Sequence, residues 1–136
     1  MDFKPNLHAK KERTIAVKHN QTTSFLWEGE NVFSTPSMIS EMEETCRLLL
    51  KEQFLSHKDW DSVGTLVNIK HLAATPVGAE ITLIAEIIDI QERRILFKVL
   101  AKDKIDVIGE GEHERFVINI PRFKERFFQK VKKLNR

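Results

Sequence analysis

Apolar and polar residues alternate along four stretches in the second half of the chain. These cover residues 62–72, 79–90, 93–102 and 106–120, and such alternation is typical of strands with one buried face. A weaker strand pattern covers residues 10–18, and Asn20 to Thr23 favour a turn. The predicted buried faces are Val63, Thr65, Val67, Ile69 and His71 in the first stretch, Ile81, Leu83, Ala85 and Ile87 in the second, and Ile95, Phe97, Val99 and Ala101 in the third. Gly109 and Gly111 in the fourth stretch indicate a bulge or a close approach of two backbones.

A helical period replaces the alternation between Pro36 and about Leu55. The apolar stripe of this helix consists of Ile39, Met42, Cys46, Leu49 and Leu50. Thr35 is the predicted N-cap, with Pro36 in the first turn. A second helix is predicted from Pro121 through Phe123 to Leu134. It is basic, with Lys124, Arg126, Lys130, Lys132, Lys133 and the following Arg136.

One strand, one long helix and four long strands predict an α+β fold in which an antiparallel sheet wraps around the helix. No repeat, low-complexity tract or linker interrupts residues 1–136, so we expect a single domain. Such a sheet has open edges and more apolar surface than one helix covers. Pairing with a second copy of the chain is therefore expected.

The composition is that of a globular protein, with 41% hydrophobic and 31% charged residues. The single cysteine, Cys46, cannot form an internal disulfide, which suits a cytoplasmic location. Met1 to Arg13 contain no apolar leader, and no apolar run is long enough for a membrane span. The net charge of +2 does not indicate a nucleic-acid partner, so neither nucleic acid nor membrane is expected to bind.

Glu43 interrupts the apolar stripe of the long helix, because it follows Ile39 by four positions and precedes Cys46 by three. A carboxylate in a buried stripe costs free energy unless it is paired or protonated. Its pKa can then be tuned for nucleophilic or general-base chemistry. The alternative is that Glu43 lies at the edge of the stripe and pairs with a lysine.

Three further residues are candidates for the same site. His71 shares the predicted buried face of its strand, where a histidine is either a packed core residue or a proton carrier. Thr35 supplies a hydroxyl at the helix start, and Gly64 allows a substrate to approach its backbone closely. Together with Glu43, they can supply the nucleophile or base and the donors that thioester hydrolysis requires.

His113, Glu114 and Arg115 form a charged run on the last strand. We expect it on the solvent-facing side of the sheet, held by salt bridges, unless Arg115 binds substrate. The basic final helix is either a solvated face or a site for the phosphates of coenzyme A. No phosphate-binding glycine loop, nucleophile elbow or metal-ligand spacing is present, so neither a metal nor a cofactor is expected.

The chain resembles the fluoroacetyl-CoA thioesterase family of hotdog proteins from about Val32 to Phe123. The motifs that carry the resemblance are Phe33-Ser34-Thr35-Pro36-Ser37-Met38-Ile39 with Met42-Glu43, Val63-Gly64-Thr65, the run from His71 to Gly78, and the run from Ile108 to Phe116. The resemblance implies a hotdog fold, a homodimer with sites near its interface, and an acyl-CoA substrate. It also implies Thr35, Glu43 and His71 as the catalytic set, with Gly64 holding the thioester oxygen.

The family's gating phenylalanine is replaced here. The corresponding segment reads Trp27-Glu28-Gly29-Glu30-Asn31, which favours short- to medium-chain acyl-CoA over fluoroacetyl-CoA. Phe25, Leu26 and Trp27 are expected to form an apolar wall for the acyl chain. Three other functions remain open at this stage: an acyl-CoA-binding hotdog protein without activity, a hotdog hydratase, and a nucleic-acid module based on the basic tail.

Overall fold

The computed structural model describes residues 2–24, 27 and 31–136. Five antiparallel strands form one sheet in the order β1-β5-β6-β7-β4. The strands are β1 (Lys10–Ala16), β4 (Trp60–His71), β5 (Glu80–Gln91), β6 (Arg94–Lys102) and β7 (Val107–Asn119), and the helices are α1 (Thr35–Gln53) and α2 (Ile120–Leu134). A 3-10 turn, η1 (His19–Gln21), precedes the short antiparallel pair of β2 (Thr22–Thr23) and β3 (Val32–Phe33). The predicted strands and helices are confirmed, with ends that differ by a few residues.

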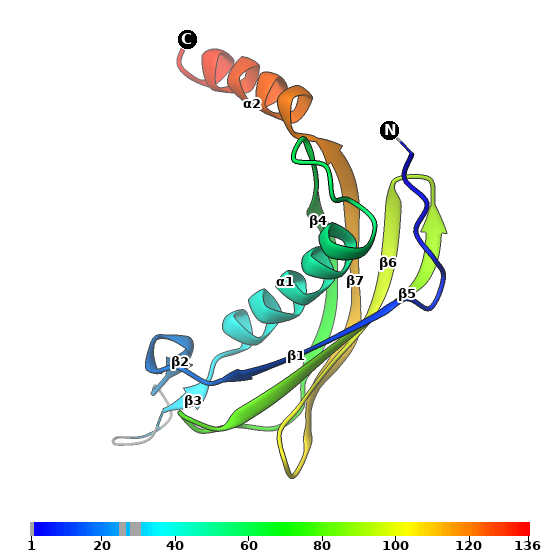
Figure 1. Ribbon diagram of the computed structural model, residues 1–136. Helices are drawn as coiled ribbons and strands as arrows, with labels where there is room; N and C mark the ends of the chain where they lie inside the picture. Colours follow the sequence, from blue (N-terminus) through cyan, green and yellow to red (C-terminus); the bar gives the residue numbers. More distant parts are fainter. Residues whose placement is uncertain (1, 25–26, 28–30) are drawn as a thin grey trace.

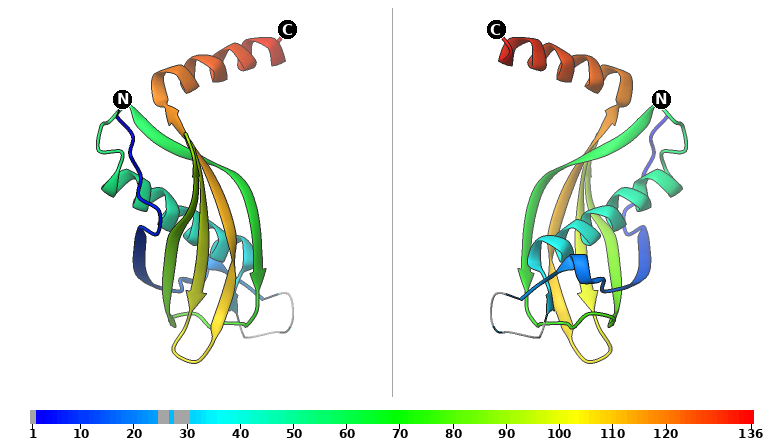
Figure 2. Two further views of the ribbon diagram at one scale, coloured as in Figure 1. Left: turned by 90° about the vertical axis from the view of Figure 1, so that its right-hand side faces the viewer. Right: turned by 90° about the vertical axis from the view of Figure 1, so that its left-hand side faces the viewer.

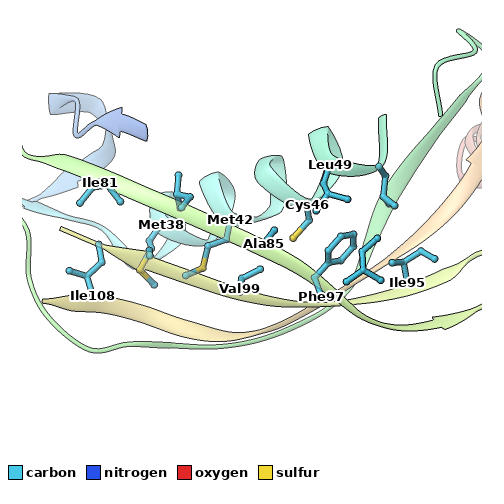
Figure 3. Close-up of a cluster of buried hydrophobic side chains, with 14 of the residues drawn as sticks. Met38, Met42, Cys46, Leu49, Ile81, Ala85, Ile95, Phe97, Val99 and Ile108 are labelled. Atoms are coloured by element: carbon cyan, nitrogen blue, oxygen red, sulfur yellow. The ribbon is translucent and has the colours of Figure 1, made fainter. Parts of the chain in front are cut away.

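The sheet curves around α1, which lies along its concave side (Figure 1). The apolar faces predicted for β5 and β6 are buried there, as is most of the stripe of α1. In Figure 3, Met38, Met42, Cys46 and Leu49 point from the helix toward Ile81, Ala85, Ile95, Phe97, Val99 and Ile108 of the strands. Nonpolar burial on this side is the main force that holds the helix against the sheet.

A set of polar contacts and one close packing contact fix the position of α1. Arg13 on β1 donates to Glu41 Oε1 at 2.7 Å and to Thr45 Oγ1 at 2.8 Å. Gly109 lies where any side chain would collide with the sulfur and methyl group of Met38, so glycine allows the first turn of the helix to approach β7. The close approach predicted at this glycine is therefore confirmed.

A β-bulge in β4 changes which residues face the helix. The register with β7 shifts between Gly64, which lies opposite Arg115, and Leu66, which lies opposite Glu114. Before the bulge, Gly64 faces α1 and Val63 faces away. After it, His71 faces α1, although the two residues are separated by an odd number of positions. The single face predicted for Val63 to His71 is wrong because strict alternation does not allow for an extra residue.

The cap of α1 also differs from the prediction. Ser34 is the N-cap, and its Oγ accepts a hydrogen bond from the Ser37 backbone N–H at 3.2 Å. Thr35 is the first helical residue. Its hydroxyl is therefore free for another partner.

Helix α2 leaves the sheet at the end of β7 and extends away from it, as Figures 1 and 2 show. None of its residues is buried. In the described part of the chain, neither helix has the length and hydrophobicity needed to cross a bilayer.

Candidate active site

Thr35 and His71 meet at a cleft of about 560 Å³ at one end of the sheet. Thr35 Oγ1 lies 2.7 Å from His71 Nδ1, which is a short hydrogen bond between the first turn of α1 and the last residue of β4. The cleft is lined by Thr23, the segment from Val32 to Pro36, and the segment from His71 to Ala74. The hydroxyl and imidazole predicted for the site are thus adjacent in the structure.

The other ring nitrogen of His71 is buried and unsatisfied. Nε2 has no hydrogen-bond partner among the described residues. Burial lowers the pKa of His71 below its ordinary value of 6.5, and a backbone hydrogen bond with Ala73 opposes this shift. A neutral imidazole with one unpaired nitrogen can accept or donate a proton, and an orphaned buried polar atom suggests a group that a single chain does not supply.

Glu43 lies at a second cleft of about 330 Å³, at the edge of the helix stripe. Its side chain is 38% exposed, so the residue is neither in the core nor fully solvated. A Cβ on Gly64 would come within 2.8 Å of Glu43 Oε1 and 3.0 Å of His113 Cε1. The carboxylate therefore lies directly against the backbone of the bulge, where only glycine leaves room for it.

A buried polar network on β4 and β7 lies next to the Glu43 carboxylate, between it and the sheet. Arg115 donates from Nε to Ser62 Oγ at 2.6 Å and from Nη2 to Ser62 O at 2.7 Å. Its Nη1 lies 3.1 Å from His113 Nε2, and His113 Nδ1 lies 2.8 Å from Leu66 O. Glu43 Oε1 is 3.9 Å from His113 Nε2.

This network fixes the tautomer of His113. A guanidinium has donors only, so Nε2 must accept from Arg115, and Nδ1 must carry the proton given to Leu66 O. Burial is the main cause that lowers the pKa of His113, and the nearby Arg115 charge lowers it further. Burial also lowers the pKa of Arg115, and the charge of Glu43 opposes that shift. The groups next to the Glu43 carboxylate in this network are therefore the neutral imidazole of His113 and the guanidinium of Arg115.

The surface position predicted for His113 and Arg115 is wrong. Their side chains are 0% and 6% exposed and face α1, whereas Glu114 faces the other side and lies 3.8 Å from Arg94. The missed signal was the alternation itself, which groups these two residues with the buried Val117. The charges hid it, because a buried cation is uncommon unless it is paired.

The two clefts are separate within one chain. Gly64 and His71 are seven positions apart on β4, or about 20 Å at strand spacing. Thr35 and Glu43 are eight positions apart on α1, or about 12 Å. The structure thus joins Thr35 with His71, and Glu43 with Gly64 and Arg115, but it does not join the two pairs.

Two further predicted features lie apart from these clefts. Trp27 is 50% exposed and lines neither cleft. Phe25, Leu26 and Gly29 lie outside the described residues. Among the residues that are described, no cluster of His, Cys, Asp and Glu is arranged to hold a metal ion.

Comparison with known proteins identifies relatives over most of the chain. Residues 17–121 match the model of a family described as fluoroacetyl-CoA-specific thioesterase. A fluoroacetyl-CoA thioesterase from Streptantibioticus cattleyicolor is 37% identical over 119 residues, which cover 88% of this chain and 84% of the relative.

Solved structures give the same assignment. A phenylalanine-to-alanine variant of the fluoroacetyl-CoA-specific thioesterase FlK, in complex with fluoroacetate and CoA, superposes with a TM-score of 0.79 and 30% identity, covering 88% of this chain and 99% of that one. A hot-dog-like protein from Thermanaerovibrio acidaminovorans has a TM-score of 0.81 and 19% identity over 91% of both chains, a likeness of fold alone. The expected hotdog fold is confirmed.

Proposed function

Because the chain belongs to the fluoroacetyl-CoA-specific thioesterase family, we propose that it hydrolyses short- to medium-chain acyl-CoA to the carboxylic acid and free CoA. The observation that carries this proposal is the Glu43 carboxylate, which is held against the Gly64 backbone above a buried guanidinium. A thioester carbonyl bound beside them, in the cleft that both line, would have an attacking group on one side and a charged donor close by.

The proposed residues divide the reaction among them. Glu43 either attacks the thioester carbonyl, which forms an anhydride that water then hydrolyses to the free acid and restored Glu43, or removes a proton from a water that attacks the carbonyl directly. The Gly64 N–H donates to the developing oxyanion, and Arg115 contributes positive charge next to it. His71, oriented by Thr35, delivers a proton to the departing CoA sulfur. The CoA complex of a relative supports a CoA thioester as the bound form of the substrate.

We further propose that the two clefts are combined across a homodimer. β4 is an edge of the sheet, and its exposed side chains include Leu66 and Val67, which are 46% and 45% exposed. Edge strands that pair around a two-fold axis perpendicular to the sheet run antiparallel. If the axis passes between Leu66 and Val67, the partner's His71 lies opposite Ser62.

Distance favours this arrangement over a site within one chain. Ser62 is two positions from Gly64, so the partner's His71 would lie within about 10 Å of Gly64. The same two residues of one chain are about 20 Å apart. The unpaired Nε2 of His71 would then face the Glu43 cleft of the other subunit.

A thiol-release assay with a series of acyl-CoA substrates tests the activity. The wild-type protein is expected to hydrolyse acyl-CoA. Glu43→Gln is expected to lose about a thousandfold or more of this activity while it stays folded, because an amide is neither base nor nucleophile. Glu52→Gln, on the same helix but lining neither cleft, is the matched control and is expected to keep wild-type activity. Binding of acyl-CoA without turnover by the wild type would instead indicate a non-catalytic binding protein.

Heterodimers test whether the site is shared. In a purified heterodimer of Glu43→Gln and His71→Ala chains, a shared arrangement leaves one site with both residues intact and the other with neither. Activity near half that of the wild type is therefore expected, although both parent homodimers are inactive. If each site lies within one chain, both sites of the heterodimer are damaged and no activity returns.

Two finer points belong to the same proposal. Gly29 lies near the position of the family's gating phenylalanine in the sequence, which supports a broad chain-length range rather than fluoroacetyl-CoA selectivity. The buried, free thiol of Cys46 supports a reducing, cytoplasmic location.

A further inference from the structure

Residues 120–136, the C-terminal arm, have an unpartnered apolar side. Phe123, Phe127 and Phe128 are 46%, 55% and 52% exposed, and Leu134 is 72% exposed. Ile120, Phe123, Phe127, Val131 and Leu134 follow one another at spacings of three or four, so they lie on one side of α2. Such a stripe is typical of a helix that packs against another surface.

The charge of the chain is divided unevenly between this arm and the rest. The arm contains seven Lys and Arg and one acidic residue, which leaves fifteen basic and nineteen acidic residues in positions 1–119. A chain of net charge +2 thus consists of a body of −4 and an arm of +6. The phosphates of CoA are anionic, so the body repels this substrate on average and the arm attracts it.

The direction of the arm points to a place for it in the dimer. α2 begins where Asn119 of β7 pairs with Trp60 at the start of β4. In both panels of Figure 2, the helix extends toward the side of the sheet on which β4 ends. Antiparallel pairing of two β4 strands would bring the end of the partner's β4 next to α2. The partner's Thr35–His71 cleft would then lie beside α2, together with the partner's Leu72 and the partner's Val77, which are exposed in a single chain.

We propose that the C-terminal arm of one subunit packs its apolar side beside the Thr35–His71 cleft of the other subunit, and that its Lys and Arg side chains bind the phosphates of CoA there. This inference rests on the proposed function and dimer. It assigns the CoA end of the substrate to a different chain from the His71 that protonates the sulfur. Charge-assisted bonds to phosphate suit exposed Lys and Arg side chains at such a position.

The test compares two thioesters that share the acetyl and pantetheine groups, of which only acetyl-CoA carries the phosphorylated adenosine part with its phosphates. An arm variant carries Lys130→Gln, Lys132→Gln and Lys133→Gln, and a matched body variant carries Lys98→Gln, Lys102→Gln and Lys104→Gln, which removes the same charge. The ratio of kcat/KM for acetyl-CoA to kcat/KM for acetyl-pantetheine is expected to fall about tenfold in the arm variant, through KM, and to stay constant in the body variant. An unchanged ratio in the arm variant overturns the proposal. A wild type inactive on both thioesters overturns the proposed function instead.

Heterodimers test the placement. When one chain carries Glu43→Gln, the intact site combines Glu43 of the second chain with His71 of the first. The arm variant on the second chain is expected to raise KM for acetyl-CoA, and on the first chain to have no effect; the reverse result overturns binding across the dimer. A third measurement uses phosphatidylglycerol vesicles, because a basic amphipathic helix can also bind anionic lipid. Flotation of wild-type protein with these vesicles, together with an unchanged ratio in the arm variant, would assign the arm to a membrane surface.

Discussion

Thr35 Oγ1 and His71 Nδ1 are 2.7 Å apart, although 36 positions separate them in the chain. This bond joins the first turn of α1 to the end of β4, the strand next in sequence. It fixes the plane of the imidazole and leaves Nε2 without a partner among the described residues. The hydroxyl therefore orients the ring, and the opposite edge of the ring is available for proton transfer.

His71→Ala is expected to lower kcat by about 100- to 10,000-fold, the usual contribution of a general acid or base. The melting temperature should change by only a few degrees, because His71 lies at a cleft and not in the core. Thr35→Val keeps the shape of the side chain and removes the hydroxyl, so its effect on kcat should be largely absent in the His71→Ala background. Lys70→Ala, on the other face of β4, serves as the control. A drop in stability with full activity would make His71 a packing residue.

Gly64→Ala is expected to reduce activity much more than stability. Its Cβ would come within 2.8 Å of Glu43 Oε1, and the end of the flexible, partly exposed Glu43 side chain can move away. That movement takes the carboxylate from the position proposed for attack. Turnover should fall by about tenfold or more, with the denaturant midpoint nearly constant. Equal activity in Gly64→Ala and the wild type would contradict the proposed position of the thioester.

Stability is expected to fall on acidification because folding partly desolvates two histidines, His71 at its cleft and the buried His113. Burial lowers the pKa of both His71 and His113 below the ordinary 6.5, so between these values the unfolded chain binds protons that the folded chain does not. The two histidines do not reduce the free energy of unfolding above about pH 7. This free energy falls as the pH drops through 6.5 toward the lower pKa values of the folded state. Urea midpoints at about pH 7.5 and about pH 5.5 measure the effect. His113→Gln should weaken this dependence.

Chain-length preference tests the apolar wall that the sequence predicts for Phe25, Leu26 and Trp27. A pocket gains about 0.8 kcal/mol for each methylene that it buries, or roughly fourfold. We expect turnover to rise from acetyl-CoA to butyryl- or hexanoyl-CoA, without a strong preference for fluoroacetyl-CoA. Trp27→Ala should flatten this trend, measured as kcat/KM over the series, and the exposed Trp27 would have to close over the substrate to act in this way. A flat profile in the wild type would remove the basis for such a wall.

Periodicity predicted the strands and helices because each element has one dominant buried face. It failed where one residue changes the period or where two adjacent residues compete for one role. The bulge after Gly64 reverses the faces of β4, and the glycine at its start is a residue type that marks bulges in strands, a signal that strict alternation does not use. Ser34 and Thr35 are both good caps, and only the contact with His71 distinguishes them. The burial of Arg115 depends on its hydrogen bonds to Ser62 and His113. Ser62 is distant in the chain, and His113 stands in a charged run that indicates a surface position.

The adjacency of Ser34 and Thr35 has a consequence for how this scaffold can diversify. One hydroxyl stabilises the helix start by about 1 kcal/mol, and its neighbour orients the imidazole. Since the two tasks are carried by different side chains, replacing Thr35 alters the chemistry without releasing the first turn of α1. If the proposed role of the cleft holds, variation at position 35 can therefore explore new reactivity while Ser34 keeps the helix start capped.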